Sequence, residues 1–519
     1  MELELKKGSF RAARPVFSHS VTAEESADAV VPDSKPDILR IVDTTAVAEL
    51  SGREIRGGRI YLSGVVRCFA LYAPENEGSL EALTAALPFS VAVEPEKELF
   101  QDAVIRAGVE SVSAFAREQN PRRINLRASV KIFCRGWEQD EPDYCEDIPA
   151  AEAFGVELRR EEVRTSCISG FGEKLLSVME SAELGEVKTG GAELLRWDVK
   201  PKITETKLIP EKVVFKGELE VSALLKTPED SNPAANLSVS VPFSGVTDCS
   251  GADTDADAEL SCRCFDTELS VAEETGTGRG ILTVKTNVSV EAQSRRIEMP
   301  SVVTDAYSTT HELKAAYSKL VISPESRRVA VRVGASETVS AGIGIKSVIC
   351  TRVSAEDAVI SAGELGCAFR ATVIFEGEDG SVYSASKNFR AAVEADCGGM
   401  RAAEIRVCEE SYRITGADRA EIRAAAEIVL ESGGEESKNV LSAASAFERE
   451  VSGRSPSLTL CGTLEGESWW DLGKRMRARV EDILSANALS EEDPPGDRML
   501  LIPKKAPCRM CKTRDGGNA

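Results

Sequence analysis

Aromatic residues and histidine are scarce in this chain of 519 residues. Phe, Trp and Tyr together make up 5% of it, and there are two histidines, His19 and His311. The cores are therefore expected to be built from Val, Ala, Leu and Ile. A Ser-His-Asp or Cys-His arrangement would have to use one of two histidines far apart in the sequence, and no His-Glu-x-x-His motif occurs. We expect no catalytic residues and no enzymatic activity.

Long apolar runs and an excess of basic residues are also missing. No stretch of about 18 apolar residues occurs, so we predict no helical membrane span. The opening MELELKKGSFRAARP has no apolar core with a cleavage site, so we expect no export signal and a cytosolic location. The 63 basic and 85 acidic residues give a formal net charge of −22. Such a surface keeps a protein soluble and repels phosphates and anionic lipids, which argues against nucleic-acid partners.

The 14 cysteines are expected to be reduced thiols, as is usual in the cytosol. Several lie in apolar strand patterns, where cysteine acts as a small hydrophobic residue: Cys68, Cys367 and Cys408. In the basic tail, Cys508 and Cys511 form a Cys-x-x-Cys pair with no second pair nearby to complete a four-ligand zinc site. Metal sharing or cross-linking between chains remains an alternative to an unstructured tail.

Three other motifs fail as ligand sites. DTDADAEL, which starts at Asp253, begins like a calcium loop, but Ala258 and Cys264 stand where that loop needs Gly and Glu. GTGRG lacks the spacing of a dinucleotide-binding turn, and GIGIKS has Ile345 where a phosphate-binding loop needs Gly. We therefore expect neither a metal nor a cofactor.

Three stretches share one strand-like frame. They are RIYLSGVVRCFALYA around Gly64, KVVFKGELEVSALLK around Gly217 and AVISAGELGCAFRATVIF around Gly363. The residues two, four, six and eight positions after each glycine are apolar or amphipathic, which is the period of a half-buried strand. These glycines fit a bulge or a close backbone approach better than a ligand site. A phenylalanine follows each glycine at an offset of 25, 26 and 26 residues: Phe89, Phe243 and Phe389.

Two more landmarks recur with this frame. Each copy closes with another alternating strand, and each opens with a Glu-Leu-basic tripeptide whose leucine lies 59, 59 and 50 residues before the glycine. The tripeptides start at Glu4, Glu157 and Glu312. Four landmarks at near-constant offsets predict three tandem repeats. The repeats are residues 1–150, 151–303 and 304–450.

Each repeat is rich in short alternating strands and turn residues, which predicts an antiparallel β-sandwich or open barrel. One segment fits two structures. GFGEKLLSVMESAEL, residues 170–184, has apolar residues at helical spacing, but it also fits a strand with its connection.

The pattern changes after the polar linker SGRSPS. A brief strand, LTL, is followed by Ser468, which can cap a helix. Apolar residues then recur at helical spacing from Trp469 and again from Val480, and PPGDRMLLIP ends in a turn and a strand. The order β-α-α-β predicts a small module over residues 456–503, followed by a basic tail over residues 504–519.

This module resembles a LysM domain. The residues that match the LysM pattern are Gly466, Ser468, Trp470, Leu472, Lys474, Val480, Ile483, Asn487, Leu489, Pro495, Gly496, Leu500, Ile502 and Pro503. Glu467, Trp469, Gly473 and Met476 depart from the pattern, and Gly473 should cost its helix about 1 kcal/mol relative to alanine. LysM domains generally bind N-acetylglucosamine polymers in a groove between two loops, which here would be residues 466–469 and 489–496.

The resemblance implies twelve candidate residues for binding a partner or a glycan: Gly466, Glu467, Ser468, Trp469, Trp470, Lys474, Asn487, Leu489, Ser490, Glu491, Pro495 and Gly496. The second loop carries the acidic run from Glu491 to Asp493, from which a charged protein gains more than a neutral glycan. We expect Trp470 to pack in the core of the module. Trp469 replaces an aliphatic residue and is a candidate exposed anchor.

Three long β-type repeats followed by one LysM-like module resemble the SPOCS/SipL-type spore-coat morphogenetic proteins of endospore-forming bacteria. The segments DAYSTTHEL, KPDILRIV and ETKLIPEKVVFKGELEV carry this resemblance. It implies a non-enzymatic adaptor in the mother-cell cytoplasm, at the forespore surface. There its LysM domain would bind the ATPase of the coat basement layer. The alternative is a peptidoglycan-binding protein of the wall or cortex.

Overall fold

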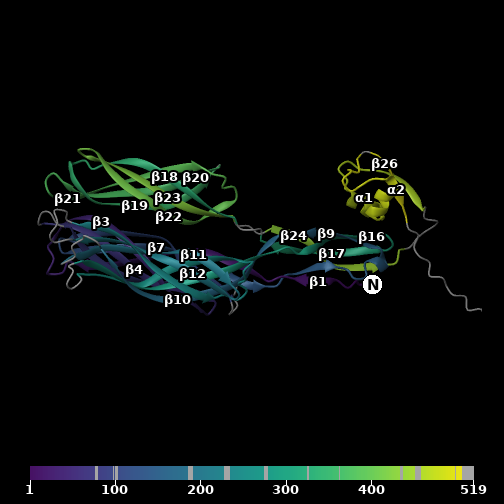
Figure 1. The fold of residues 1–519 in the computed structure, drawn as a ribbon, viewed down its shortest axis with the longest axis horizontal. Coiled ribbons are helices and arrows are strands. Elements are labelled where there is room, and N and C mark those ends of the chain that lie inside the picture. The colour runs from purple at the N-terminus through teal and green to yellow at the C-terminus, as the bar shows by residue number, and fades with distance from the viewer. Residues whose placement is uncertain are drawn as a thin grey trace, which may run out of the picture.

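The computed structural model describes residues 1–75, 80–96, 99, 103–184, 191–226, 234–273, 279–323, 327–361, 363–432, 436–449, 457–496 and 498–504. The chain is mainly β, with 75% of it in strands and 4% in helices. Long strands run along the long axis of the molecule, and the two α-helices lie together near one end (Figure 1). In the described part of the chain, no helix is long and apolar enough to cross a membrane.

The first strand set consists of eight antiparallel strands. They are β1 (Lys6–Ser9), β2 (Ala12–Val30), β3 (Ile38–Arg56), β4 (Arg59–Pro74), β5 (Glu81–Val93), β6 (Val104–Asn120), β7 (Arg123–Asp140) and β8 (Asp143–Asp147). β1 pairs with β8, β4 lies between β3 and β5, and β7 lies between β2 and β6. The two three-stranded sheets enclose one hydrophobic core, with Tyr72, Leu87 and Ile132 among its members.

The second strand set has the same pairing order. A short 3-10 turn, η1 (Glu152–Phe154), precedes it. Its strands are β9 (Val156–Glu162), β10 (Thr165–Glu183), β11 (Glu193–Ile209), β12 (Lys212–Lys226), β13 (Ala235–Asp248), β14 (Asp257–Glu273), β15 (Gly280–Glu298) and β16 (Ser301–Ser308). β9 pairs with β16, β12 lies between β11 and β13, and β15 lies between β10 and β14. The ambiguous segment 170–184 is therefore a strand, since β10 covers all but its last residue.

The third strand set repeats the order once more. Its strands are β17 (Glu312–Ile322), β18 (Arg328–Ser340), β19 (Ile345–Ser361), β20 (Glu364–Gly377), β21 (Val382–Glu394), β22 (Met400–Gly416), β23 (Arg419–Ser432) and β24 (Glu436–Phe447). β17 pairs with β24, β20 lies between β19 and β21, and β23 lies between β18 and β22. In all three sets, a Glu-Leu-basic tripeptide lies at the start of the first strand.

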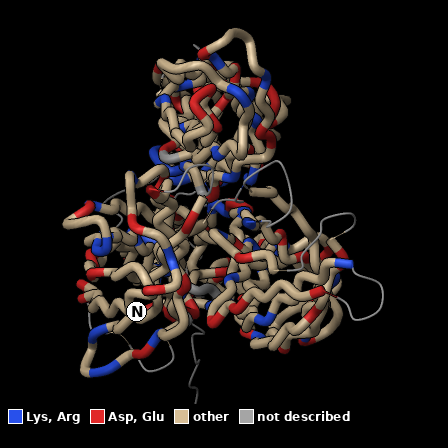
Figure 2. The backbone as a smooth tube through the Cα atoms, turned by 90° about the vertical axis from the view of Figure 1, so that its left-hand side faces the viewer, with Lys and Arg blue, Asp and Glu red and all other residues tan. Residues whose placement is uncertain are grey.

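The three strand sets pack into one body. Figure 2 shows three lobes around a common centre, with acidic and basic residues interspersed on each. A hydrophobic cluster takes residues from all three sets, including Leu71, Leu224 and Ile374. Beside it, the Asp43 carboxylate of the first set accepts hydrogen bonds from Arg196 of the second at 3.0 Å and from Arg352 of the third at 3.1 Å. Apolar contact and a shared ion-pair network thus join the sets.

The landmark glycines of the first two sets lie opposite phenylalanine rings. Gly64 pairs with Phe89 across β4 and β5, and Gly217 pairs with Phe243 across β12 and β13. A Cβ added at Gly64 would lie 2.1 Å from the backbone oxygen of Glu49 and 2.7 Å from the Phe89 ring. The predicted close backbone approach is confirmed at these two glycines.

The predicted frame is wrong in the third set. Gly363 lies in the turn before β20 with a φ of 86°, and Phe389 pairs instead with Phe369, whose ring stacks on it at 5.3 Å. Phe369 therefore holds the place of Gly64, beside the same bulge in the neighbouring strand. The shift of six residues is even, so it preserves the alternation of inward and outward side chains, and periodicity alone could not detect it.

The C-terminal module follows the three sets. It consists of β25 (Leu458–Gly462), α1 (Trp469–Met476), α2 (Val480–Asn487) and β26 (Met499–Pro503), and β25 pairs with β26 in a two-stranded antiparallel sheet. The helices cover one face of this sheet and form a small core with it, which includes Leu472, Ile483 and Ile502. In Figure 1 the module lies over β16.

Candidate interaction surface

The described residues contain no arrangement that resembles a catalytic or metal centre. His19 lies in β2 beside the Phe17 ring, and the Nδ1 of His311 bonds with the Thr310 hydroxyl at 2.8 Å. No group of three His, Cys, Asp or Glu side chains in the described residues could hold a metal ion. Cys508 and Cys511 lie outside the described residues.

The cysteines of the strand patterns differ in their surroundings. Burial raises the pKa of Cys68 and of Cys367 to about 11, so both thiols stay protonated and unreactive near neutral pH. Cys408 is exposed, although its strand pattern predicts an apolar core position. It lies where β22 bulges between Val407 and Glu409, and the bulge breaks the alternation that predicted its burial.

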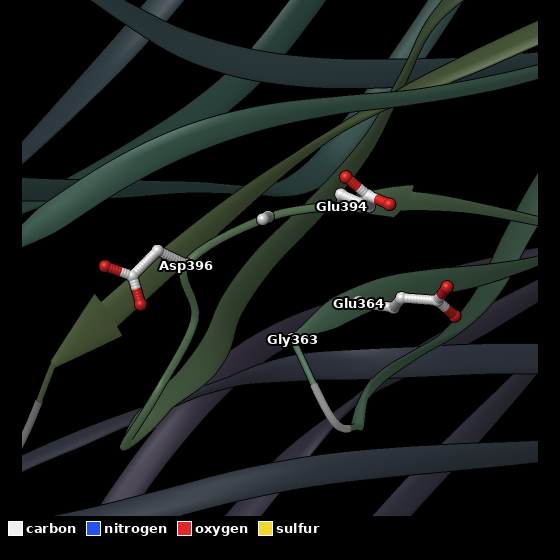
Figure 3. Close-up of a pocket in the computed structure, with 5 residues that line it drawn as sticks. Gly363, Glu364, Glu394 and Asp396 are labelled. Carbon is white, nitrogen blue, oxygen red and sulfur yellow. The ribbon is translucent and has the colours of Figure 1, made fainter.

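An open hollow of about 480 Å³ lies where β20 begins and β21 ends, away from the residues that the sequence predicts for binding. It is lined by Gly363, Glu364, Glu394, Ala395 and Asp396. The three carboxylates point in different directions (Figure 3), so they do not converge on a common ligand position.

Helix α1 begins as the sequence predicts. The Ser468 hydroxyl accepts a hydrogen bond from the backbone N–H of Asp471 at 3.2 Å, and the Asp471 carboxylate accepts one from the backbone N–H of Ser468 at 3.4 Å. This reciprocal capping box satisfies two donors that the first turn of a helix leaves free. It fixes where the adjacent tryptophans point.

The two tryptophans have the opposite roles to those predicted. Trp469 is the core residue: it is 8% exposed, packs with Leu472 and Ile483, and its indole donates to the backbone oxygen of Asp493 at 2.7 Å. Trp470 points out of the core toward β16, where its ring lies edge-on to Tyr307 at 4.8 Å. The LysM pattern predicts a core position for Trp470. In the structure, β16 of the second strand set covers this residue instead.

Asp305 in β16 is the main polar contact of this face of α1. Its carboxylate accepts hydrogen bonds from the Trp470 indole at 2.8 Å and from the Lys474 ammonium at 2.6 and 2.7 Å. The Tyr317 hydroxyl of β17 donates to it at 2.7 Å. Burial alone would raise the pKa of Asp305, but these hydrogen bonds outweigh it and lower the pKa, so the carboxylate is ionised at neutral pH.

Two further contacts extend this interface to the connection between α1 and α2. The Tyr307 hydroxyl donates to the backbone oxygen of Ala478 at 2.8 Å, and Arg479 forms an ion pair with Glu157 of β9 at 2.8 Å. The glycine inside α1 also lies here. A Cβ at Gly473 would be 2.6 Å from the Tyr307 hydroxyl. Any larger residue there would collide with Tyr307, which explains why a glycine occupies this position although it weakens the helix.

The two predicted binding loops contact each other. The Trp469 indole of the first loop donates to Asp493 of the second, as described above. Just before the first loop, the Thr463 hydroxyl donates to the backbone oxygen of Gly496. In the first loop Glu467 forms an ion pair with Arg475 of α1 at 2.6 Å, and in the second the Ser490 hydroxyl donates to the Asp493 carboxylate at 3.0 Å. Gly466 and Gly496 both have positive φ, of 74° and 60°, which favours glycine at these turns.

The remaining predicted residues separate into structural and exposed ones. Asn487 is structural, because its side-chain amide N–H donates to the backbone oxygens of Ile483 and Leu501, each at 2.7 Å. Leu489 packs partly against the core of the module and Pro495 is half-buried. Glu491 is exposed, as is its neighbour in the acidic run. The twelve residues therefore do not form one surface, since Trp470 and Lys474 face β16.

Sequence reasoning missed an apolar outer face on the two-stranded sheet. Leu458 and Leu460 of β25 and Met499 of β26 are 51%, 63% and 64% exposed, and Leu464 in the adjacent loop is 62% exposed. Leu460 pairs with Leu501 and Met499 with Gly462, so these side chains share the face that the helices leave open. The alternation in LTL and MLLIP predicts this face, because Leu458, Leu460 and Met499 fall on the same side of their strands. Neither helix of the module covers that side, so these apolar side chains stay exposed.

Comparison with family models gives a match in the second strand set. Residues 192–272 match the model described as SipL, SPOCS domain. The chain carries a SipL-type SPOCS domain. This SPOCS domain comprises β11, β12 and β13 and nearly all of β14. Neither the comparison with curated proteins nor that with solved structures found a match.

The SPOCS domain links the chain to sporulation. Domains of this type suggest a role in protein interaction and are not known as enzymes. The core of the SPOCS domain includes Leu219 and Val221 of β12, which alternate with exposed or half-buried polar residues. The match thus falls on the alternating stretch that carried the resemblance in the sequence.

Proposed function

We propose that this chain is a non-enzymatic scaffold of endospore coat assembly. In this proposal it stands at the forespore surface in the mother-cell cytoplasm, where it docks the ATPase of the coat basement layer and other coat proteins. The observation that carries the proposal is the SPOCS match over residues 192–272. The joining of three strand sets into one body suits a scaffold, because it offers a large and rigid surface.

The proposal includes a domain organisation. The three strand sets are tandem SPOCS-type repeats over residues 1–150, 151–303 and 304–450, and the C-terminal module over residues 456–503 is a LysM domain. The thrice-repeated pairing order supports the first part. The β-α-α-β order and the capping box support the second.

The ATPase is proposed to bind the outward side of the module. That side combines the apolar face of Leu458, Leu460 and Met499 with the exposed acidic run that starts at Glu491. Apolar area supplies most of the affinity of a protein interface, and a charged rim adds specificity and a faster association. A partner with an apolar patch bordered by basic residues fits this surface.

A pull-down of the coat-base ATPase with the full-length chain tests this proposal. We expect the double variant Glu491→Lys/Glu492→Lys to weaken binding about tenfold, because it turns attraction into repulsion at the rim. Deletion of residues 457–504 should abolish recovery. The matched control is Glu24→Lys/Glu118→Lys, which makes the same charge change on exposed residues of the first strand set.

Equal recovery with and without the module would refute docking through it. N-acetylglucosamine polymers are the alternative ligand of the same loops, so chitin oligomers are titrated against the full-length chain in parallel. Saturable glycan binding without capture of the ATPase would favour the wall or cortex protein instead.

A further inference from the structure

The face of α1 that carries Trp470 and Lys474 lies against the chain's own second strand set. We propose that the β9–β16 strand pair is a built-in receptor for the C-terminal module, so that the module is held in one orientation. Its ligand is the surface formed by α1 and the α1–α2 connection. The module then presents β25, β26 and the two loops outward. This proposal does not rest on the identity of any coat partner.

The receptor is preorganised around Asp305. A bulge between Val303 and Asp305 interrupts the pairing of β16 with β9. The Asp305 carboxylate also accepts a hydrogen bond from the backbone N–H of Ala306 at 2.9 Å, in addition to that from Tyr317. The β strands thus fix the carboxylate before α1 adds Trp470 and Lys474. A fixed acceptor costs less conformational entropy to engage than a mobile one.

Tyr307 of the strand pair and the end of α1 satisfy each other's hydrogen-bonding and packing needs. Tyr307 is 5% exposed, and a phenol hydroxyl buried to that degree needs a hydrogen-bond partner. The module supplies that partner, the backbone oxygen of Ala478, which lies just after α1. Gly473 leaves room for the hydroxyl. The helix therefore accepts a destabilising glycine where the receptor approaches most closely.

The other strand sets act as internal comparisons. In the third set, Ser445 and Phe447 pair with the opening tripeptide as Asp305 and Tyr307 do in the second. Phe447 is 43% exposed, with the Lys314 ammonium 5.1 Å from its ring centre. In the first set, β8 ends at the position of Asp305. Of the three strand pairs, only the second combines the carboxylate with a buried tyrosine.

Hydroxyl-radical footprinting of the full-length chain, read by mass spectrometry, tests the docking. In the unmodified chain Tyr307 and Trp470 should be oxidised slowly and Phe447 fast. Replacing Asp305 by alanine should raise the oxidation rate of Tyr307 about tenfold, because the docked population falls. Trp469 reports on folding, since it is protected by the core of the module and not by the interface.

A charge reversal separates loss of docking from unfolding. Glu157→Arg alone should expose Tyr307, and Glu157→Arg combined with Arg479→Glu should restore its protection with Trp469 protected throughout. Protection that fails to return in the double variant would contradict the proposal. So would a Tyr307 that is as reactive as Phe447 in the unmodified chain. Neither readout requires the ATPase, so failure here is distinct from failure of the proposed function.

Discussion

Replacing Trp469 by alanine is expected to unfold the C-terminal module and leave the three strand sets folded. Truncation of a buried tryptophan costs about 3–5 kcal/mol through lost apolar contact and the cavity left behind. The variant also loses the hydrogen bond from the indole to Asp493. A module of this size has few kcal/mol to spare. Hydrogen exchange of α1 and α2 should rise to the rate of an unfolded chain.

The adjacent tryptophan is the matched control. Replacing Trp470 by alanine removes contacts with Tyr307 and Asp305 but none that hold the core of the module together. We expect the helices of that variant to stay protected from exchange, while Tyr307 becomes exposed. The same exchange pattern in both variants would contradict the assignment of the two residues to different surfaces.

Replacing Gly64 by alanine is expected to destabilise the first strand set by about 3 kcal/mol, which is typical of severe overpacking. The added Cβ would lie 2.1 Å from the backbone oxygen of Glu49 and 2.7 Å from the Phe89 ring. The ring can move, but the backbone oxygen belongs to the paired strand β3 and can shift only if the ladder distorts. Urea denaturation with hydrogen exchange of β4 and β5 peptides measures the loss.

Gly366 provides the control for that substitution. It also lies inside a central strand, β20, but a Cβ there would meet its nearest atoms at 3.6 and 3.8 Å. Replacing Gly366 by alanine should therefore be neutral or stabilise the third set by about 0.5 kcal/mol, because it reduces the entropy of the unfolded chain. If both variants lost the same stability, the close approach at Gly64 would not be the cause.

Local sequence patterns predicted the strands because burial in this fold follows the alternation of side chains. KVVFKGELEV has inward residues such as Leu219 and Val221 at every second position, and the structure buries them. The helix start at Ser468 was predictable for the same reason, since a capping box needs only residues three positions apart. Features that depend on neighbours in sequence could thus be derived without the structure.

Features that depend on residues far apart in sequence but close in space could not be derived from the sequence. The register of the third set differs by six residues from the predicted frame, and an even shift leaves the apolar pattern unchanged. The roles of Trp469 and Trp470 were exchanged because Tyr307 lies more than 150 residues earlier and gave no signal within the module. Cys408 is exposed because it lies in a bulge of β22, and the residue pattern of the strand does not predict that bulge.

The proposed scaffold combines a sporulation-related SPOCS domain with a C-terminal module that is held in one orientation. The three strand sets share one apolar cluster and the Asp43 ion pairs, which join them into one body. Docking of α1 on β16 would extend that body to the module and orient its apolar and acidic side outward. If the strand sets lie on the forespore surface, a partner bound to the module would be held at a fixed distance from that surface.

The most direct test of the scaffold proposal is the position of the full-length chain in sporulating cells. A fluorescent fusion imaged through sporulation should form a shell around the forespore on its mother-cell side. The Glu491→Lys/Glu492→Lys variant should form a weaker shell, because its binding to the ATPase is expected to weaken about tenfold. The Glu24→Lys/Glu118→Lys control should form the same shell as the unmodified chain. Diffuse signal in the mother cell, or signal at the outer cell wall, would contradict the proposal.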